Sequence, residues 1–463
     1  MEKHAETMSG IDSLMLALDH PGPSPVISGS FAFDSTLDFK RIEQVVKDRL
    51  LCHDRFTMRP TGKTGFATWE TDKDMDLGYH LCRMQISYSG CKTRLRALFS
   101  ELAAAPLDPL RPLWKIHYIE DVKEKKSFVF FRLHHCMGDG ISLVRLLASI
   151  TDDNAGTIDH RIDNTPPFPR PAGSGRRCRK ACDFAAKKIK TIVEDPAHAA
   201  KCAKKVRIAL SETAMTVARV LMLPPDRKHF FEKNPGTERL LAWSAPLPLD
   251  DIKKACVRFN ATVNDIVVAL TTAGLRRYLL QYGDLDDKPS IRMAVPVNIR
   301  LPEPESEGDV RLNNEFGFLL AHLPIYIKDP ARRIRRVHGI LEKLKQTSEA
   351  FSAWAGMNAL GSAPAEVARK TALLFAKKIT GIISNVPGPG KSLYFSGGRI
   401  INIMFWLPLI KGMGIGISAI SYDNAISLGI VVDSRMVPDP EVIIGHIEEE
   451  FAVLLEECQN RKE

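Results

Sequence analysis

The fold is decided by the stretch Ser127-Phe128-Val129-Phe130-Phe131-Arg132-Leu133-His134-His135-Cys136-Met137-Gly138-Asp139-Gly140. Its first half is rich in strand-forming residues and predicts a strand that ends at the two histidines. The glycines permit backbone angles that other residues avoid, so residues 137–140 predict a tight turn. Residues 141–147 have helical periodicity. The stretch therefore predicts a strand, a polar turn and a helix in succession.

The two histidines are predicted to have different roles, because neighbouring strand residues point to opposite faces. His135 shares a face with Phe131 and Leu133, whereas His134 lies on the other face. This argues against one metal site made of His134, His135 and Asp139. Asp139 either orients a histidine directly or holds the loop through an arginine, and the spacing alone does not distinguish these two roles. An imidazole can accept a hydroxyl proton near neutral pH, although most histidine pairs are merely structural.

The rest of the chain alternates strands and helices in two blocks, which predicts an α/β (α+β) fold of two lobes with mixed sheets flanked by helices. Residues 1–163 form the first block and residues 237–463 the second. Residues 164–236 are predicted to be a Pro/Gly-rich linker and a basic amphipathic helical crossover. Strands are predicted at residues 26–33, 240–246, 291–297, 317–327, 381–385, 415–422 and 425–433. Helices are predicted at residues 37–51, 91–104, 249–260, 266–282 and 438–455.

Charge and composition narrow the class of protein. The formal net charge is +9, and the basic excess is concentrated between residues 170 and 233. There the cations are interleaved with aliphatic residues at helical spacing, which favours a membrane surface or a solvated helix over nucleic acid. The nine cysteines show no zinc-binding spacing, and a reducing compartment is expected. We expect a cytoplasmic protein, since neither a signal peptide nor an apolar run of about 18 residues is evident.

Several motifs occur in an order that matches one known family. They are HHxxxDG at 134–140, PLDxxRPLW at 106–114, Asn264-Asp265, SNVPGP at 384–389, Trp69 with residues 76–80, Ser421-Tyr422 and residues 437–440. With these motifs the sequence resembles the bacterial-type wax ester synthase/diacylglycerol acyltransferase family of the chloramphenicol acetyltransferase-like superfamily. The resemblance covers most of the chain. HHxxxDG alone is shared across the superfamily, but the full ordered set is specific.

The resemblance implies two chloramphenicol acetyltransferase-like lobes with a tunnel between them that reaches the histidine from both sides. One side would admit acyl-CoA as co-substrate, and the other a long-chain alcohol or diacylglycerol. His135 would be the general base and Asp139 the structural aspartate, and no metal or organic cofactor would be required. Such substrates are scarcely soluble in water. Peripheral binding to a membrane or lipid-droplet surface through basic residues 176–228 is therefore expected, with a solvated helical crossover as the alternative.

The candidate site residues fall into three groups. The catalytic motif contains His135, Asp139 and His134. Substrate or oxyanion contacts are expected from Asn264, Asp265, Ser384, Asn385 and Gly140. Structural support is expected from Arg300, Trp114 and Pro112, with Arg300 a candidate partner of Asp139. Each motif also has a simpler interpretation, in which Trp114 only packs in the core, Asn264-Asp265 only begins a helix, and Ser384-Asn385 only forms a turn.

The sequence departs from the family pattern at three places that bear on which molecule accepts the acyl group. Asn298 stands where a small residue is usual, Asn313-Asn314 replaces Gly-Asn, and Gly416 stands where an asparagine is common. Two rival classes stay open on the sequence alone. One is a condensation-like or small-molecule acyltransferase with a soluble alcohol or amine acceptor, and the other is a non-catalytic lipid-binding relative.

Overall fold

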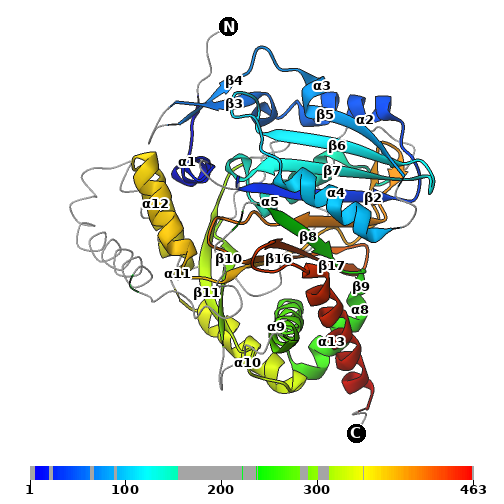
Figure 1. The fold of residues 1–463 in the computed structure, drawn as a ribbon, viewed down its shortest axis with the longest axis vertical. Helices are drawn as coiled ribbons and strands as arrows, with labels where there is room; N and C mark the ends of the chain where they lie inside the picture. The colour runs from blue at the N-terminus through cyan, green and yellow to red at the C-terminus, as the bar shows by residue number, and fades with distance from the viewer. Residues whose placement is uncertain are drawn as a thin grey trace.

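The structure is a computed structural model of the 463-residue chain. It describes residues 6–19, 24–62, 67–87, 91–154, 222, 236, 238–281, 290–300, 312–347 and 349–460. The predicted basic crossover, including residues 176–228, lies almost entirely outside the described residues. Two mixed sheets organise the chain, with the first above the second in Figure 1.

The first sheet has the strand order β15-β2-β7-β6-β5. Its bounds are β2 Val26–Phe33, β5 Leu81–Ile86, β6 Trp114–Asp121, β7 Lys126–His134 and β15 Asn402–Trp406. The central strand β7 runs antiparallel to β2 and β6, and β5 is parallel to β6. The edge strand β15 comes from far along the chain and pairs Trp406 with Ser28. Residues from both ends of the chain therefore build the sheet that carries the two histidines.

The second sheet has the order β11-β10-β12-β16-β17-β8, and β9 pairs with β17 beside β8. Its bounds are β8 Arg239–Trp243, β9 Leu247–Pro248, β10 Ile291–Asn298, β11 Phe316–Leu323, β12 Gly381–Val386, β16 Ile415–Tyr422 and β17 Ala425–Asp433. β12 lies parallel to β10 and β16, and the other pairs are antiparallel. Three strands form a small sheet, β1 Glu6–Thr7, β4 Thr68–Thr71 and β3 Met58–Thr61, and a two-stranded ribbon joins β13 Tyr394–Phe395 to β14 Gly398–Arg399.

Helices cover both sheets. In the first half they are α1 Gly10–Ala17, α2 Phe39–Val45, α3 Leu77–His80, α4 Lys92–Ala104 and α5 Gly140–Ile150. In the second half they are α8 Leu249–Phe259, α9 Val263–Gln281, α10 Pro330–Lys345, α11 Glu349–Gly361, α12 Ala365–Ala376 and α13 Pro440–Asn460. Short helical turns occupy Val46–Leu50, Asp54–Phe56 and His135–Met137. Helices α9, α10 and α13 lie together below the second sheet in Figure 1.

The hydrophobic cores follow this layering. One cluster packs under the first sheet around Trp69, Trp114 and Phe31, and a second packs α9 and α13 against the second sheet. A third cluster, with Phe99 and Trp406, lies where α4 meets strand β8. There Ser100 accepts a hydrogen bond from the main-chain N–H of Leu241 at 2.9 Å. The two sheets thus share a packed apolar contact.

The predicted strands and helices are confirmed, with shifted ends. The expected strand 317–327 is too long, because β11 ends at Leu323 and Pro324 begins a turn. The strand through the histidines ends at His134, and His135 begins a single helical turn. The elements that were not predicted are strands β1, β3 to β6, β9 and β13 to β15 and helices α1, α3 and α10 to α12. Among the described residues, no helix is long and apolar enough to cross a membrane.

Candidate active site

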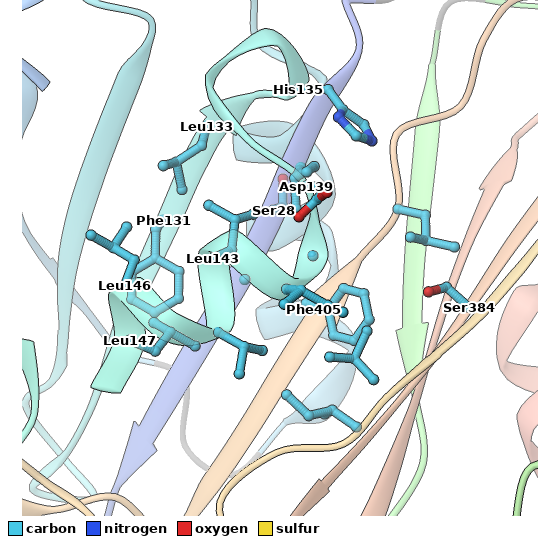
Figure 2. A pocket seen from close by; sticks show the side chains of 18 of the residues that line it. Ser28, Phe131, Leu133, His135, Asp139, Leu143, Leu146, Leu147, Ser384 and Phe405 are labelled. Atoms are coloured by element: carbon cyan, nitrogen blue, oxygen red, sulfur yellow. The ribbon is translucent and has the colours of Figure 1, made fainter. Parts of the chain in front are cut away.

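A cavity of about 250 Å³ lies between the two sheets, and its wall is almost entirely apolar. Strands β2, β7 and β15 of the first sheet and β10, β11, β12 and β16 of the second contribute to its wall, together with α5. Figure 2 shows Phe131, Leu146 and Leu147 on one side of it and Ser384 on the other. The cavity is thus suited to an aliphatic chain, with few polar groups to fix its orientation.

His135 lines this cavity, as do Phe131 and Leu133 of the preceding strand. Its ring lies against Phe316, with the ring centroids 5.4 Å apart. Its main-chain N–H donates to the carbonyl of Pro25 at 2.8 Å. The ring atom Nδ1 is buried and forms no hydrogen bond within the described part of the chain. Burial lowers the pKa of His135, and its own main-chain carbonyl, Asp139 and Asn314 act in the opposite direction. A neutral imidazole therefore faces an apolar space.

His134 is wholly buried and does not line the cavity. Its Nδ1 accepts a hydrogen bond from the main-chain N–H of Cys136 at 3.2 Å and lies 2.9 Å from the Cys136 thiol. Because Nδ1 accepts, the proton of the neutral ring sits on Nε2, which lies 3.8 Å from Asp19. Burial lowers the pKa of His134 to about 4. The ring is therefore engaged in holding the turn rather than presented to the cavity.

Asp139 holds the turn in place through an arginine. It caps α5 by accepting from the main-chain N–H of Ser142 at 3.0 Å, and its other oxygen accepts from that of Glu315 at 3.0 Å. Arg300 donates to Asp139 at 2.9 Å and forms a buried ion pair with it. No hydrogen bond joins Asp139 to His135 within the described part of the chain. Of the two roles left open by the sequence, the contacts support the loop-holding one, and the pairing raised for Arg300 is present.

Arg300 also binds the segment that precedes β11. Its Nη2 donates to the main-chain carbonyl of Asn313 at 2.7 Å and to the hydroxyl of Ser142 at 2.8 Å. The hydroxyl of Ser142 donates in turn to the Asn313 carbonyl at 3.0 Å. The turn of the first sheet is therefore clamped to residues that lead into the second sheet. Among the described residues, no cluster of three or more His, Cys, Asp or Glu side chains is arranged to hold a metal ion.

Comparison with known proteins identifies the family to which the chain belongs. A family model of the wax ester synthase/diacylglycerol acyltransferase catalytic domain matches residues 8–267, and that of the C-terminal domain matches residues 312–455. The chain belongs to the wax ester synthase/diacylglycerol acyltransferase family. It is 27% identical over 425 residues to a probable diacylglycerol O-acyltransferase of Mycobacterium tuberculosis, covering 88% of this chain and 85% of that protein. It is 24% identical over 455 residues to the O-acyltransferase WSD of Acinetobacter baylyi, covering 95% of each.

Solved structures show the same fold. A wax ester synthase/diacylglycerol acyltransferase from Marinobacter aquaeolei superposes with a TM-score of 0.68 at 20% identity, covering 98% of this chain and all of that chain. The starter condensation domain of a rhizomide synthetase superposes with a TM-score of 0.59 at 11% identity, covering 98% and 95%. These likenesses confirm the predicted two-lobed, chloramphenicol acetyltransferase-like fold class.

Of the family's other motifs, SNVPGP reaches the cavity and the Asn-Asp motif does not. Ser384, Asn385 and Gly140 line the cavity, the last as the first residue of α5. Asp265 instead forms a reciprocal cap with Thr262: its carboxylate accepts from the Thr262 N–H at 2.8 Å, and its own N–H donates to the Thr262 hydroxyl at 3.2 Å. This cap begins α9.

The remaining Asn-Asp contacts lie behind the cavity wall. Asn264 contacts the amide of Asn385 at 3.4 Å, and His338 lies 2.8 Å from the carboxylate of Asp265. Neither Asn264 nor Asp265 lines the cavity, so any effect of theirs on a ligand would pass through Asn385 and the start of α9.

The PLDxxRPLW segment packs the first sheet against the cavity. Trp114 donates from Nε1 to the carbonyl of Phe56 at 2.8 Å, and its ring stacks on His80 at 4.5 Å. Trp114 also lines the cavity, whereas buried Pro112 accepts from the Trp114 main-chain N–H at 2.9 Å. Asn314 and Asp12, which contact the His135 turn, were missed: the first was noted only within Asn313-Asn314, and the second carries no signal beyond a helix N-terminus.

Proposed function

We propose that this chain transfers a long-chain acyl group from acyl-CoA to the hydroxyl of a fatty alcohol or of diacylglycerol, with His135 as general base. Nε2 takes the hydroxyl proton while the oxygen attacks the thioester carbonyl. The tetrahedral intermediate then collapses, and the departing CoA thiolate receives the proton from His135. Relatives named diacylglycerol O-acyltransferase and O-acyltransferase support this reaction class.

The observation that carries the proposal is the position of His135. It is a neutral imidazole at the wall of an apolar cavity between two lobes, where a thioester and an alcohol can meet without water. Cys136 is no alternative nucleophile, because it is buried away from the cavity and burial raises the pKa of its thiol well above the ordinary value. A single base acting on two bound substrates accounts for the reaction without an acyl-enzyme.

Ser384 is the proposed donor to the oxyanion. Its hydroxyl comes from β12 and lies below His135 in Figure 2, and Asn385 beside it also lines the cavity. A donor placed where negative charge develops stabilises the transition state more than the ground state. Asn298 lines the cavity as well, so this departure lies where the acceptor would bind. Gly416 does not line it, and a Cβ there would meet Val431 at 2.8 Å.

The test is an acyl-transfer assay with palmitoyl-CoA against long alcohols, diacylglycerol, short polar alcohols and amines. Turnover with the long alcohols or diacylglycerol, abolished in His135→Ala, is the expected result. Wild-type turnover by His135→Ala would disprove the mechanism. Preference for polar alcohols or amines would instead assign the chain to a small-molecule or condensation-like reaction. Acyl-chain binding without any turnover would assign it to a lipid-binding protein.

We further propose that the protein meets its lipid substrates by peripheral binding to a membrane or lipid-droplet surface. The support is the insolubility of the proposed substrates and the basic, aliphatic sequence between residues 176 and 228. Flotation with anionic and neutral liposomes tests it. Binding that requires anionic lipid is expected, and failure of the intact protein to float with either would reject it.

A further inference from the structure

The cavity beside His135 continues as an apolar arm between helix α5 and the first sheet. The arm is defined here by six of its lining side chains, Leu50, Trp114, Phe131, Leu143, Leu147 and Ile150. They come from α5, from strands β6 and β7 and from the helical turn Val46–Leu50. In Figure 2 the leucines of α5 extend away from His135, with Leu143 nearer to it than Leu147. The arm therefore leads from the proposed base along the helix.

The described residues that form the arm offer no free polar group to a ligand. Its side-chain donor, Nε1 of Trp114, is engaged by the carbonyl of Phe56 at 2.8 Å. Arg132 of β7 directs its side chain to the other face of the sheet, where it donates to the carbonyl of Ala105 at the end of α4. The arm thus suits a chain that carries no polar substituent.

The part of the cavity between the two sheets is different, because Asn298, Ser384 and Asn385 line it. An acceptor such as diacylglycerol carries a hydroxyl and two ester groups, which need polar partners when they leave water. An unsubstituted acyl chain has no such groups and gains free energy simply by leaving water. The difference in polarity favours the acyl chain for the arm and the acceptor for the space between the sheets.

The length of the arm follows from α5. The helix runs from Gly140 to Ile150, and both of these end residues line the cavity. A helix of 11 residues is about 16 Å long, which is the length of roughly 13 carbons in an extended chain. A longer chain has to bend within the arm or meet its far end.

Leu50 and Ile150 close the far end of the arm. Both are buried, as is Phe56, which also lines the cavity. Leu50 ends a turn that is wider than an α-helical one, because the main-chain N–H of Leu51 donates to the carbonyl of Val46 at 3.0 Å. Wide turns of this kind often occur at functional sites. Here the turn packs against α5, so the arm ends in side chains.

Polar contacts next to this end fix the distance between the turn and the helix. Arg49 forms an ion pair with Asp152 at 2.8 Å, and Nε2 of His53 lies 3.3 Å from the hydroxyl of Ser149. Each contact joins the segment that carries Leu50 to the end of α5. The far end of the arm is therefore held by the fold itself, whatever ligand is bound.

We propose that Leu50 and Ile150 set the length of the acyl chain that this protein accepts. The proposal rests on the proposed acyl-CoA-dependent function. The chain lies along α5 with its thioester at His135 and its terminal methyl group against Leu50 and Ile150. Each further methylene that enters the arm tightens acyl-CoA binding about fourfold, until the chain reaches the far end.

The test measures the binding of saturated acyl-CoAs, from octanoyl to stearoyl, by titration calorimetry at concentrations where the ligands are monomeric. In wild type the affinity should rise with chain length and then level off at a break near the length of the arm. Ile150→Ala opens the far end, so the break should move by about two carbons to longer chains. Leu50→Phe fills it, so the break should move to shorter chains. Should Ile150→Ala not fold, Leu50→Ala opens the same end.

Ile42→Ala is the matched control. Ile42 lies in α2 and is buried in the same hydrophobic cluster as Leu50, but it does not line the cavity. Its truncation should lower the melting temperature and leave the break in place. In parallel, turnover is measured with one acyl-CoA and alcohols of increasing length, to show which substrate the arm holds.

A break that stays in place when the far end is opened and when it is filled would overturn the proposal. So would a shift in the alcohol series instead of the acyl-CoA series, because the arm would then hold the acceptor. Binding needs no turnover, so a lipid-binding protein without activity would still show the break. The absence of any acyl-CoA binding would reject the proposed function together with this inference, whereas normal turnover with an unmoved break would reject this inference alone.

Discussion

The wall of the cavity and the polar layer behind it differ in what their side chains are free to do. On the wall, His135 and Ser384 face an apolar space. Behind it, His134 and Asp265 are buried, and each uses a side-chain atom to hold a turn or a helix start, while Asp139 at the edge of the cavity caps α5 and pairs with Arg300. The family's motifs supply both sets. Residues that are adjacent in sequence, such as His134 and His135, therefore belong to different layers.

Burial alone therefore does not identify the catalytic residue. Burial lowers the pKa of both histidines, and both rings are neutral at physiological pH. What separates them is the state of the ring nitrogens. Nδ1 of His134 accepts from Cys136, whereas no acceptor or donor of the described residues holds the ring of His135 at full hydrogen-bonding geometry. The wall should therefore control turnover, and the layer behind it should control stability.

The largest expected effect is the contrast between the two histidines. His135→Gln should lower kcat about 1,000-fold, or about 4 kcal/mol of transition-state stabilisation, because no base remains. The melting temperature should change little. His134→Asn keeps an acceptor near the position of Nδ1, so it should retain most of the turnover. Steady-state kinetics and calorimetry of both variants test this, and equal losses of kcat would erase the distinction between the two layers.

Removing Arg300 should have the largest effect on stability. Arg300→Met leaves Asp139 buried without its cation, and breaking such a pair costs about 3 kcal/mol. Turnover should fall too, since the turn that carries His135 is then held less firmly. The double variant Arg300→Met/Asp139→Asn should recover part of the melting temperature, because no unpaired charge is left. If Arg300→Met is as stable as wild type, the clamp between the two lobes contributes nothing to folding.

Much of this division was readable in the sequence. Strand parity separated His135 from His134, although the strand ends at His134, one residue before His135. The periodic segments and the glycine turn predicted the long strands of the second sheet, β2 and β7 of the first, and helices α2, α4, α5, α8, α9 and α13. The alternation still holds although the strand is shorter, because His135, the first residue of the following turn, keeps its side chain on the cavity side with Phe131 and Leu133.

The parts that could not be predicted depend on contacts between distant segments. β15 is five residues long and joins the first sheet from residues 402–406, and nothing local in the sequence distinguishes that edge from others. Asn314 and Asp12 are 302 positions apart, and their hydrogen bond exists only because α1 and the start of β11 meet beside His135. The Asn-Asp motif shows the converse, since its helix-start interpretation needed only local rules and describes Asp265 well.

The free energy of unfolding below about pH 6.5 should depend on the protonation of His134. The pKa of His134 falls from its ordinary value near 6.5 to about 4 on folding, so the unfolded chain binds the proton more readily. Its contribution is fully present above about pH 6.5 and is lost as the pH falls toward 4, at a cost of about 3 kcal/mol by the acid end. His134→Asn removes this titration.

The difference between variant and wild type is the quantity to measure, because Asp12 titrates with the opposite sign. Burial raises the pKa of Asp12 from 3.8 to about 6, so its protonation stabilises the folded state over much of the same range. Melting temperatures recorded from pH 7 to pH 4 should fall less steeply for His134→Asn than for wild type. Parallel profiles would mean that His134 is not held neutral by the fold.

The smallest expected effect concerns the Asn-Asp motif. Thr262→Ala removes the hydroxyl that caps α9 and should cost about 1 kcal/mol, seen as a drop of a few degrees in melting temperature. Thr262→Ser keeps the hydroxyl and is the matched control. Because Asp265 lies behind the wall, kcat and KM should be nearly unchanged in both variants. A fall in kcat for Thr262→Ala with no change in melting temperature would contradict this. It would mean that the motif acts on the cavity wall, through the contact of Asn264 with Asn385.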